Sequence, residues 1–393
     1  MLRRDERMTH RIRQGRAPQL LRLLFDCHSF DTPWQGTTSY LSGLINALPG
    51  AVERRARDLR LELYCAARHE INIRRHVHEP AIWVPAASGF LRRNMWDIPR
   101  ALRRLDIDIV VSQYVRPFLS PCPTVSVIHD VLFLDNPDLF ARGYVATRKI
   151  LFRWSARTSD CVTTVSTYSA TRIATHFGIP QEDIHVIPNG VHSGLFAGAQ
   201  SRETVSGRPV RLLSVSRLEQ RKRHEWGIEA IRTLSSLGIS AEYTIVGHGQ
   251  GRYAKDLRQM VQQAALDGLR VQIKEGLGMQ QLAEEYTRAD IFICPSAIEG
   301  FGIPVAEAIA SGLPCVVTDG GALAAFRGRF AGHMSARDDQ SSFISGVVDV
   351  AQALPHYVTT ARHWREDAMQ RYGWPHIADS FLDMTMQMQG SER

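Results

Sequence analysis

The sequence predicts an α/β fold made of two parallel sheets, each covered by helices. Short apolar runs of strand length alternate with amphipathic helical stretches along most of the chain, an order typical of parallel sheets. Eleven such runs are too many for one open sheet, and the run Ile187-Pro-Asn-Gly-Val191 breaks the alternation near the middle. We therefore expect two Rossmann-like domains that face each other across a cleft, with ligands beyond the C-terminal strand ends.

The expected strands are rich in β-branched and aliphatic residues, which favour strands. In the first half they are Leu21–Asp26, Leu61–Ala66, Ile107–Ser112, Thr124–His129, Cys161–Ser166 and His185–Ile187. In the second half they are Arg211–Ser216, Ala241–Val246, Val271–Ile273, Ile291–Cys294 and Cys315–Thr318. Helical periodicity is clearest in Tyr40–Leu48, Tyr168–His176, His224–Leu237 and Lys255–Ala265.

The domain boundaries follow from this order and from local composition. We expect a flexible tail over residues 1–17 and an N-terminal domain over residues 18–190. A Gly-, Ser- and Ala-rich linker over 188–205 then leads into a C-terminal domain over 191–368. The helical segment 369–393 is expected to pack back onto the N-terminal domain.

Charge and cysteine content narrow the functional classes. Residues 1–190 hold 26 Lys and Arg against 18 Asp and Glu, a net of +8, whereas residues 191–393 hold 21 against 22, a net of −1. The basic residues are scattered and no nucleic-acid-binding module is visible, so we expect no nucleic acid partner. An anionic membrane surface or a lipid diphosphate fits better. No run approaches the ~18 apolar residues of a membrane-spanning helix. The six cysteines lack paired spacing, which indicates reduced thiols in a cytoplasmic protein and no metal framework.

Glu299 and Glu307 frame the most informative segment, in which a Gly-Phe-Gly-Ile-Pro turn leads from a strand into a helix. Pro304 suits the first helical position, and Gly312 suits a left-handed helix end. We therefore expect Glu299 on the loop and Glu307 on the first turn of the helix. The helix start offers N–H groups to a phosphate, and carboxylates accept hydrogen bonds from sugar hydroxyls. Alone, the two glutamates could also be acidic residues favoured by the helix dipole.

Three further loops should lie at the same sheet edge. Arg217 and Lys222 follow the strand Arg211–Ser216, where they can neutralise a diphosphate. Gly247 opens a Gly-His-Gly turn after the next strand, and Leu277 lies in a Gly-Leu-Gly loop. A lone Gly-x-Gly is weak evidence and lacks the complete dinucleotide-binding pattern.

These motifs resemble the retaining nucleotide-sugar glycosyltransferases of family 4, which have the GT-B fold. The matching segments are SVSRLEQRKRH (214–224), VGHGQ (246–250), the G-L-G…L-A-E-E-Y stretch and EGFGIPVAEAIASGLPCVVTD (299–319). The resemblance implies that Arg217 and Lys222 bind the donor diphosphate, that Glu299 holds hydroxyls of the transferred sugar, and that Glu307 holds the nucleotide ribose. It also implies donor contacts from Gly247, Leu277 and the backbone of Phe301, Gly302 and Ile303.

The first half carries two further correspondences. His129 ends a strand in His-Asp, and the matching family histidine lies in the catalytic pocket; alone, such a histidine is more often a capping or core residue. Gly36 matches a family glycine at a helix start near the phosphates, although this chain has Gly-Thr-Thr where the family often has Gly-x-Gly. A second departure follows Asp319, where the family's Pro-Glu pair is absent.

By this resemblance the protein is a metal-independent hexosyltransferase without a cofactor. The stretch His129–Phe140 looks most like bacterial mannosyl- and related transferases of polysaccharide and lipopolysaccharide assembly, which favours GDP-mannose, with a UDP-sugar second. The basic first domain suggests a lipid-linked glycan acceptor at the inner face of the cytoplasmic membrane. A non-catalytic nucleotide-sugar-binding protein on this scaffold is the alternative. A nicotinamide-dependent dehydrogenase is disfavoured because no Gly-x-Gly-x-x-Gly follows the first strand.

The segment Phe90–Leu105 combines apolar residues with five arginines. It can be a membrane-surface helix or an ordinary amphipathic helix that is interrupted at Pro99 and leads into the next strand. We favour the second interpretation, which leaves the arginines free to meet anionic lipid.

Overall fold

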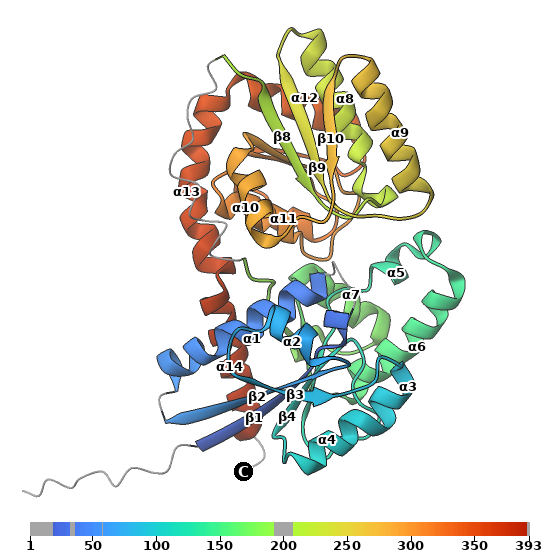
Figure 1. The fold of residues 1–393 in the computed structure, drawn as a ribbon, viewed down its shortest axis with the longest axis vertical. Helices are drawn as coiled ribbons and strands as arrows, with labels where there is room; N and C mark the ends of the chain where they lie inside the picture. The colour runs from blue at the N-terminus through green and yellow to red at the C-terminus, as the bar shows by residue number, and fades with distance from the viewer. Residues whose placement is uncertain (1–18, 32–35, 57, 192–206, 391–393) are drawn as a thin grey trace, which may run out of the picture.

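The computed structural model describes residues 19–31, 36–56, 58–191 and 207–390, and these form two parallel sheets. The first sheet has the order β3-β2-β1-β4-β5-β6-β7, and the second has the order β10-β9-β8-β11-β12-β13. Figure 1 shows one sheet and its helices stacked above the other. The predicted pair of Rossmann-like halves is therefore confirmed.

The strands of the first sheet are β1 (Gln19–Asp26), β2 (Leu59–Ala67), β3 (Ala81–Pro85), β4 (Ile109–Gln113), β5 (Thr124–Val127), β6 (Cys161–Thr164) and β7 (Ile184–Val186). Its helices are α1 (Gly36–Arg55), α2 (Glu70–His76), α3 (Phe90–Arg92), α4 (Ile98–Arg104), α5 (Leu132–Asp135), α6 (Arg142–Thr158) and α7 (Thr167–Phe177). Short 3₁₀ turns occur at His28–Asp31, Pro137–Leu139 and Gln181–Asp183.

The strands of the second sheet are β8 (Val210–Val215), β9 (Ala241–Val246), β10 (Arg270–Lys274), β11 (Ile291–Cys294), β12 (Cys315–Thr318) and β13 (Gly332–Ser335). Its helices are α8 (His224–Ser236), α9 (Arg252–Leu266), α10 (Met279–Arg288), α11 (Ile303–Ala310) and α12 (Gln340–Gln352). Short 3₁₀ turns occur at Gln220–Lys222 (η6) and Ala322–Phe326.

Strand order reverses at β1–β4 in the first sheet and at β8–β11 in the second. The apolar runs that predicted these strands are buried, as is every residue of β4, β5, β6 and β12. At such switch points the loops leaving adjacent strands diverge and open a ligand crevice. The loops after β1, β8 and β11 leave the sheets here, and they lead to Gly36, to Arg217 and Lys222, and to Glu299.

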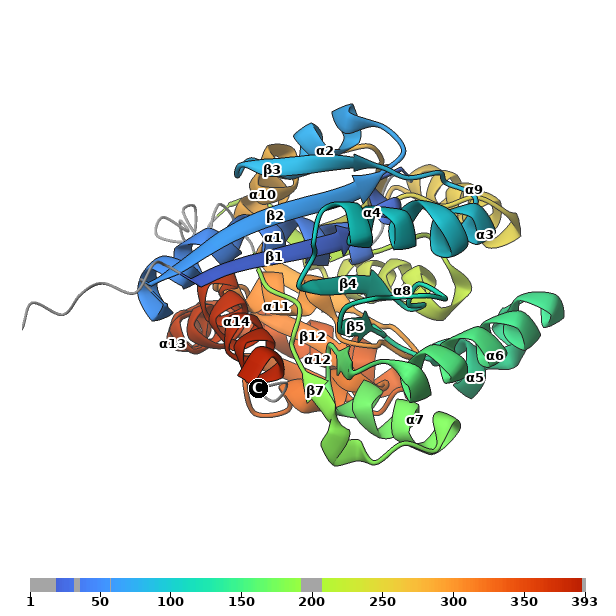
Figure 2. The same ribbon diagram turned by 90° about the horizontal axis from the view of Figure 1, so that it is seen from below.

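The C-terminal segment packs back onto the first half, as predicted, but as two helices. α13 (Leu354–Tyr372) runs beside the second half and α14 (Trp374–Gly390) lies against α1 (Figures 1 and 2). The prediction of one helical segment over 369–393 was wrong, because the chain turns at Gly373, which forms a β-bridge with Val191. The Val191 amide also donates to the Tyr372 carbonyl (2.7 Å). The chain passes between the two halves near Val191 and again near Gly373, and these two segments are therefore hydrogen-bonded to each other.

Two strands were not predicted. β3 (Ala-Ile-Trp-Val-Pro) is apolar but short and ends in Pro85, whereas β13 has the sequence Gly-His-Met-Ser and is not an apolar run. The helical segment near Phe90 also differs from expectation, because it continues through Pro99 after a π-helical turn at Arg93–Asp97 (η2). The expected tail over residues 1–17 and the linker residues 192–205 lie outside the described residues. Every helix in the described ranges is too short or too polar to span a bilayer.

Candidate active site

Lys222, Arg221 and Glu299 form a buried charge cluster at the switch point of the second sheet. Lys222 Nζ forms an ion pair with Glu299 Oε1, and Arg221 Nη1 lies 3.2 Å from Glu299 Oε2. Arg221 also donates to the carbonyl oxygen of Ile298 (3.1 Å), and its own carbonyl accepts from the amide of Ala297 (2.7 Å). The loop after β8 is therefore fixed against the loop after β11.

The charge cluster keeps Glu299 ionised. Burial alone would raise the pKa of this carboxyl, but the Lys222 ammonium and the Arg221 guanidinium more than offset burial and lower the pKa to about 2. Glu299 is thus a permanent acceptor of hydrogen bonds at neutral pH, as the recognition of sugar hydroxyls requires.

Arg217 lies at the rim of this cluster. Its guanidinium pairs with Glu219 at 3.0 Å, and its side chain is 65% exposed. The loop behind it is held by His224, whose Nε2 lies 3.1 Å from Ser216 Oγ and 3.3 Å from the carbonyl oxygen of Arg217. Arg217 is therefore anchored at its backbone while its charge remains accessible to an anionic ligand.

The Gly300–Gly302 turn brings the two halves of the molecule together. Ser166 and Ser169, at the start of α7, donate to the Gly300 carbonyl oxygen at 2.7 and 3.1 Å. A Cβ at Gly300 would come within 2.8 Å of Asp130 Cβ, so only glycine fits against the first half. Gly302 has φ +98°, a conformation that side chains other than glycine's rarely adopt.

His129 and Asp130 follow β5 in the first half, and Asp130 lies against this turn. His129 Nε2 lies 2.6 Å from Gln113 Oε1, and its ring packs edge-on against Tyr40. Burial lowers the pKa of His129 to about 3, so its ring is neutral. With the Gln113 amide in this orientation the proton is on Nε2, which leaves Nδ1 as an acceptor.

Glu307, unlike Glu299, lies in an uncharged environment. It is the fifth residue of α11, so the expected position on the first turn was wrong, and Pro304 is the second helical residue. The Tyr286 hydroxyl donates to Glu307 Oε2 at 2.8 Å. Burial raises the pKa of Glu307 to about 7. α11 ends at Ala310, and Gly312, two residues further on, has the left-handed conformation expected of it (φ +67°).

The remaining predicted residues are Gly36, Gly247, Leu277 and Phe301, and each lies in closely packed surroundings. A Cβ on Gly36, at the start of α1, would lie 3.7 Å from Ile303 Cδ1, so α1 and α11 approach each other across the two halves. A Cβ on Gly247 would overlap the Ser216 carbonyl oxygen at 1.8 Å. Leu277 is partly buried against the core, and Phe301 is buried against Phe326 and Tyr372.

Three residues of the site were missed by sequence reasoning. Arg221, rather than Arg217, contacts Glu299, although both lie in one basic loop. Asp130 was noted only as the neighbour of His129, and burial raises its pKa in this charged surrounding. Tyr286 was noted within a motif but was given no role. Its only sequence signal is an aromatic residue on the helix before the glutamate motif.

Two facing parallel sheets with a buried charge cluster at the switch point of the second are the architecture of GT-B glycosyltransferases. Comparison with known proteins agrees: the model for glycosyl transferases group 1 matches residues 209–353, and that for glycosyltransferase family 4 matches residues 45–194. The chain therefore belongs to the family 4, group 1 glycosyltransferases.

Several bacterial proteins are similar over part of the chain. The amylovoran biosynthesis glycosyltransferase AmsK of Erwinia amylovora is 38% identical over 36% of this chain and 35% of its own length. A GDP-mannose-dependent α-(1-6)-phosphatidylinositol monomannoside mannosyltransferase of Mycobacterium tuberculosis is 28% identical over 42% of this chain and 45% of its own length. The matches thus span less than half of these relatives. The structure of sucrose-phosphate synthase from Thermosynechococcus elongatus has the same fold, with a TM-score of 0.76 and 16% identity over 95% of this chain and 100% of that one.

Proposed function

We propose that this protein transfers mannose from GDP-mannose to a hydroxyl of a lipid-linked glycan, with retention of configuration. The observation that carries this proposal is the Glu299–Gly302 turn. Its carboxylate is paired with Lys222 and Arg221 in the second half, while its glycine backbone is pressed against Asp130 and Ser166 in the first. Such a turn can contact donor and acceptor together.

In the proposed site, the donor diphosphate lies between Lys222, Arg217 and the N–H groups at the starts of α1 and α11. Glu299 accepts hydrogen bonds from sugar hydroxyls, and Glu307 accepts them from the ribose. His129 Nδ1 accepts another hydroxyl of the transferred sugar. These contacts position the donor and stabilise the charge that develops on the departing diphosphate.

The proposed reaction breaks the bond between the anomeric carbon and the phosphate oxygen. The acceptor oxygen forms its bond to that carbon on the same face of the sugar, which retains configuration. The acceptor proton passes to the leaving phosphate oxygen, so no protein base is needed at this position. Glu299 remains ionised throughout because Lys222 and Arg221 oppose its protonation.

The choice of GDP-mannose and of a lipid-linked acceptor rests on two observations. The mycobacterial relative is named for GDP-mannose and for a phosphatidylinositol mannoside, and the first half of this chain carries the positive charge. From these we also propose that the protein works at an anionic membrane surface.

Thermal unfolding with GDP, UDP and ADP tests the donor. At 100 times its dissociation constant, a nucleotide adds about 2.7 kcal/mol to the free energy of unfolding. We expect GDP to stabilise the wild type, Glu307→Gln to weaken this effect, and the exposed Glu284→Gln to leave it unchanged. Stabilisation by UDP alone would identify a UDP-sugar, in place of GDP-mannose, as the donor. No stabilisation by any of the three nucleotides would overturn the proposal.

Transfer itself is tested with radiolabelled GDP-mannose and a bacterial inner-membrane lipid extract. We expect label in the organic phase with the wild type and the Glu284→Gln control, and none with Glu299→Gln. Equal incorporation by Glu299→Gln and the wild type would contradict the role proposed for this carboxylate.

A further inference from the structure

An exposed apolar and basic surface covers one flank of the first half. Its apolar side chains lie on α3, η2, the loop after β4 and α6: Leu91, Met95, Trp96, Leu119, Tyr144 and Ile150. We call these residues, with the cations described below, the basic apolar flank. Figures 1 and 2 both show α3 and α6 on this side of the molecule.

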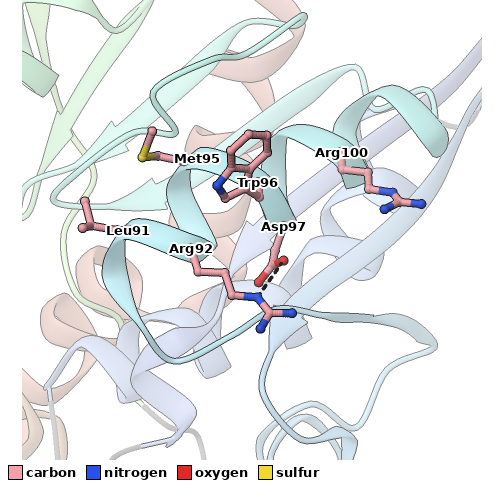
Figure 3. A pocket seen from close by; sticks show the side chains of 6 residues that line it. All are labelled: Leu91, Arg92, Met95, Trp96, Asp97 and Arg100. Atoms are coloured by element: carbon pink, nitrogen blue, oxygen red, sulfur yellow. Dashed lines mark ion pairs between the residues drawn. The ribbon is translucent and has the colours of Figure 1, made fainter.

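The apolar residues are far more exposed than core residues of their type. Trp96 is 69% exposed, Ile150 is 70% exposed and Leu119 is 60% exposed. Leu91, Met95 and Trp96 border a hollow of about 530 Å³ together with Arg92, Asp97 and Arg100. In Figure 3 the Trp96 ring projects from the helix between Met95 and Arg100. Grouped side chains of this kind mark an interaction surface.

The cations of the flank are largely unpaired. Arg100, Arg103 and Arg104 are exposed on α4, and in the described residues no carboxylate lies within 4 Å of them. α6 contains Arg142, Lys149, Arg153 and Arg157, all exposed, and it contains no acidic residue. No ion pair joins these four to the described part of the chain. Within the part of the chain that the structure describes, Arg92 is the one cation of the flank with a carboxylate partner, Asp97 at 3.6 Å. The flank therefore presents an excess of positive charge.

Packing between aromatic rings joins the two parts of the flank. The Phe118 ring lies 6.0 Å from Phe90 of α3 and 5.1 Å from Trp154 of α6, measured between centroids. The Phe118 amide also donates to the carbonyl of Asn94 (3.1 Å). Leu119 follows directly, so its exposed side chain lies between the two helical segments.

The flank also adjoins the candidate active site. α5 begins two residues after Asp130, and its Phe133 ring packs at 5.8 Å from Tyr144 of α6. The start of α6 is thus connected through one short helix to the loop that faces Glu299.

We propose that the basic apolar flank docks on the anionic surface of a lipid bilayer. The choice of a bilayer as the partner rests on the lipid-linked acceptor of the proposed function. The exposed residues that form the flank are observed independently of that function. Exposed Trp, Leu and Ile side chains partition into the interfacial region of a bilayer, and the surrounding Arg and Lys attract anionic headgroups.

Two other occupants fit less well. An acidic polysaccharide would use the cations but would gain little from exposed Ile150, Leu119 and Leu91. A second copy of this chain, related by two-fold symmetry, would oppose the cations of α6 with identical cations. A bilayer satisfies both the apolar and the charged part of the surface.

Vesicle sedimentation of the full chain tests this proposal. We expect binding to vesicles of phosphatidylethanolamine and phosphatidylglycerol, weaker binding at high salt, and none to phosphatidylcholine alone. The variant Lys149→Gln/Arg153→Gln/Arg157→Gln should lower the partition coefficient about a hundredfold, because each cation contributes about fivefold. Trp96→Ser should lower it roughly tenfold.

Matched substitutions on the second half provide the controls. Arg252→Gln/Arg288→Gln removes exposed cations and Leu266→Ser removes an exposed leucine, and both should bind vesicles like the wild type. Absence of wild-type binding, or equal loss in the control variants, would overturn the flank as the docking surface. GDP-induced thermal stabilisation of each flank variant is measured in parallel. A flank variant that is still stabilised by GDP but no longer binds vesicles supports the docking surface separately from the nucleotide site.

Discussion

The Tyr286 hydroxyl donates to Glu307 Oε2 across 2.8 Å, and both side chains are buried. This hydrogen bond opposes the effect of burial on the carboxyl, yet the pKa of Glu307 still rises to about 7. By contrast, Glu299, eight residues earlier, is held ionised by two cations. One short motif therefore holds two carboxyl groups that differ in charge near neutral pH.

Glu307 should make stability fall as pH rises. Below pH 4.5 the folded and unfolded states both hold the proton. Between pH 4.5 and 7 the unfolded state releases it first, so unfolding becomes easier, and above pH 7 the penalty of about 3 kcal/mol is complete. Glu307→Gln removes this penalty. In urea denaturation we expect its stability relative to the wild type to increase from pH 4.5 to 7 and then level off. If the free energies of unfolding of Glu307→Gln and the wild type changed with pH in parallel, Glu307 would not be the titrating group. The control Glu284→Gln should run parallel to the wild type.

Glu307 should also make nucleotide binding depend on pH. Ribose hydroxyls donate to a carboxylate, so the proposed contact needs the ionised form. We expect GDP affinity, measured by calorimetry, to fall up to about tenfold per pH unit below 7, with uptake of protons on release of the ligand. Glu307→Gln should bind weakly with little dependence on pH over this range. An equally steep pH profile in the variant would assign the dependence to another group.

Lys222→Met should destabilise the fold because it leaves Glu299 buried beside Arg221 alone. Removing one partner of a buried ion pair costs about 3–5 kcal/mol. The double variant Lys222→Met/Glu299→Gln should recover part of this loss, since it also removes the carboxylate's charge. Urea denaturation measures both, with the exposed Lys255→Met as control. If the double variant is no more stable than Lys222→Met, the ion pair is not the cause.

The strands could be predicted where burial on both faces leaves an uninterrupted apolar run, as in Ile109–Gln113 or Ile291–Cys294. β3 and β13 lie at sheet edges, where fewer neighbours demand apolar residues. β13 has no apolar run, and the apolar run of β3 is only five residues long and ends in proline. The break between α13 and α14 was missed because it depends on the bridge from Gly373 to Val191, a contact distant in sequence.

The site was predictable as a set of loops but not as a set of contacts. Glu299, Glu307 and Lys222 follow strands whose ends meet at one edge, which the sequence order already indicates. Which arginine reaches Glu299 depends on η6, where Arg221 and Lys222 both turn inward and Arg217 stays outside. That choice is made by tertiary packing.

Arg217 and Arg221 should therefore respond differently to substitution. Arg217 is exposed and makes one ion pair with Glu219, so Arg217→Gln should leave the melting temperature unchanged. If Arg217 contacts the donor diphosphate, Arg217→Gln should also lower kcat/KM, by a factor that corresponds to a loss of about 2–4 kcal/mol of transition-state stabilisation. Arg221→Gln should lower the melting temperature as well, because Arg221 holds Glu299 and the Ile298 carbonyl. Unchanged kcat/KM in Arg217→Gln would remove Arg217 from the site.

Gly43 should be required for the return of the C-terminal helix. A Cβ at Gly43 in α1 would overlap the Trp374 ring at 1.9 Å, and one at Gly190 would approach the same ring within 2.3 Å. Trp374 is the first residue of α14, and its ring packs against both Gly43 of α1 and Gly190. Gly43→Ala must therefore displace this ring. We expect a loss of about 1–3 kcal/mol, as for other overpacked cores. Gly50→Ala in the same helix meets only the flexible end of Arg54 at 3.1 Å, so it should be neutral or stabilising by up to about 1 kcal/mol. Equal urea midpoints for the two variants would show that Trp374 can move without cost.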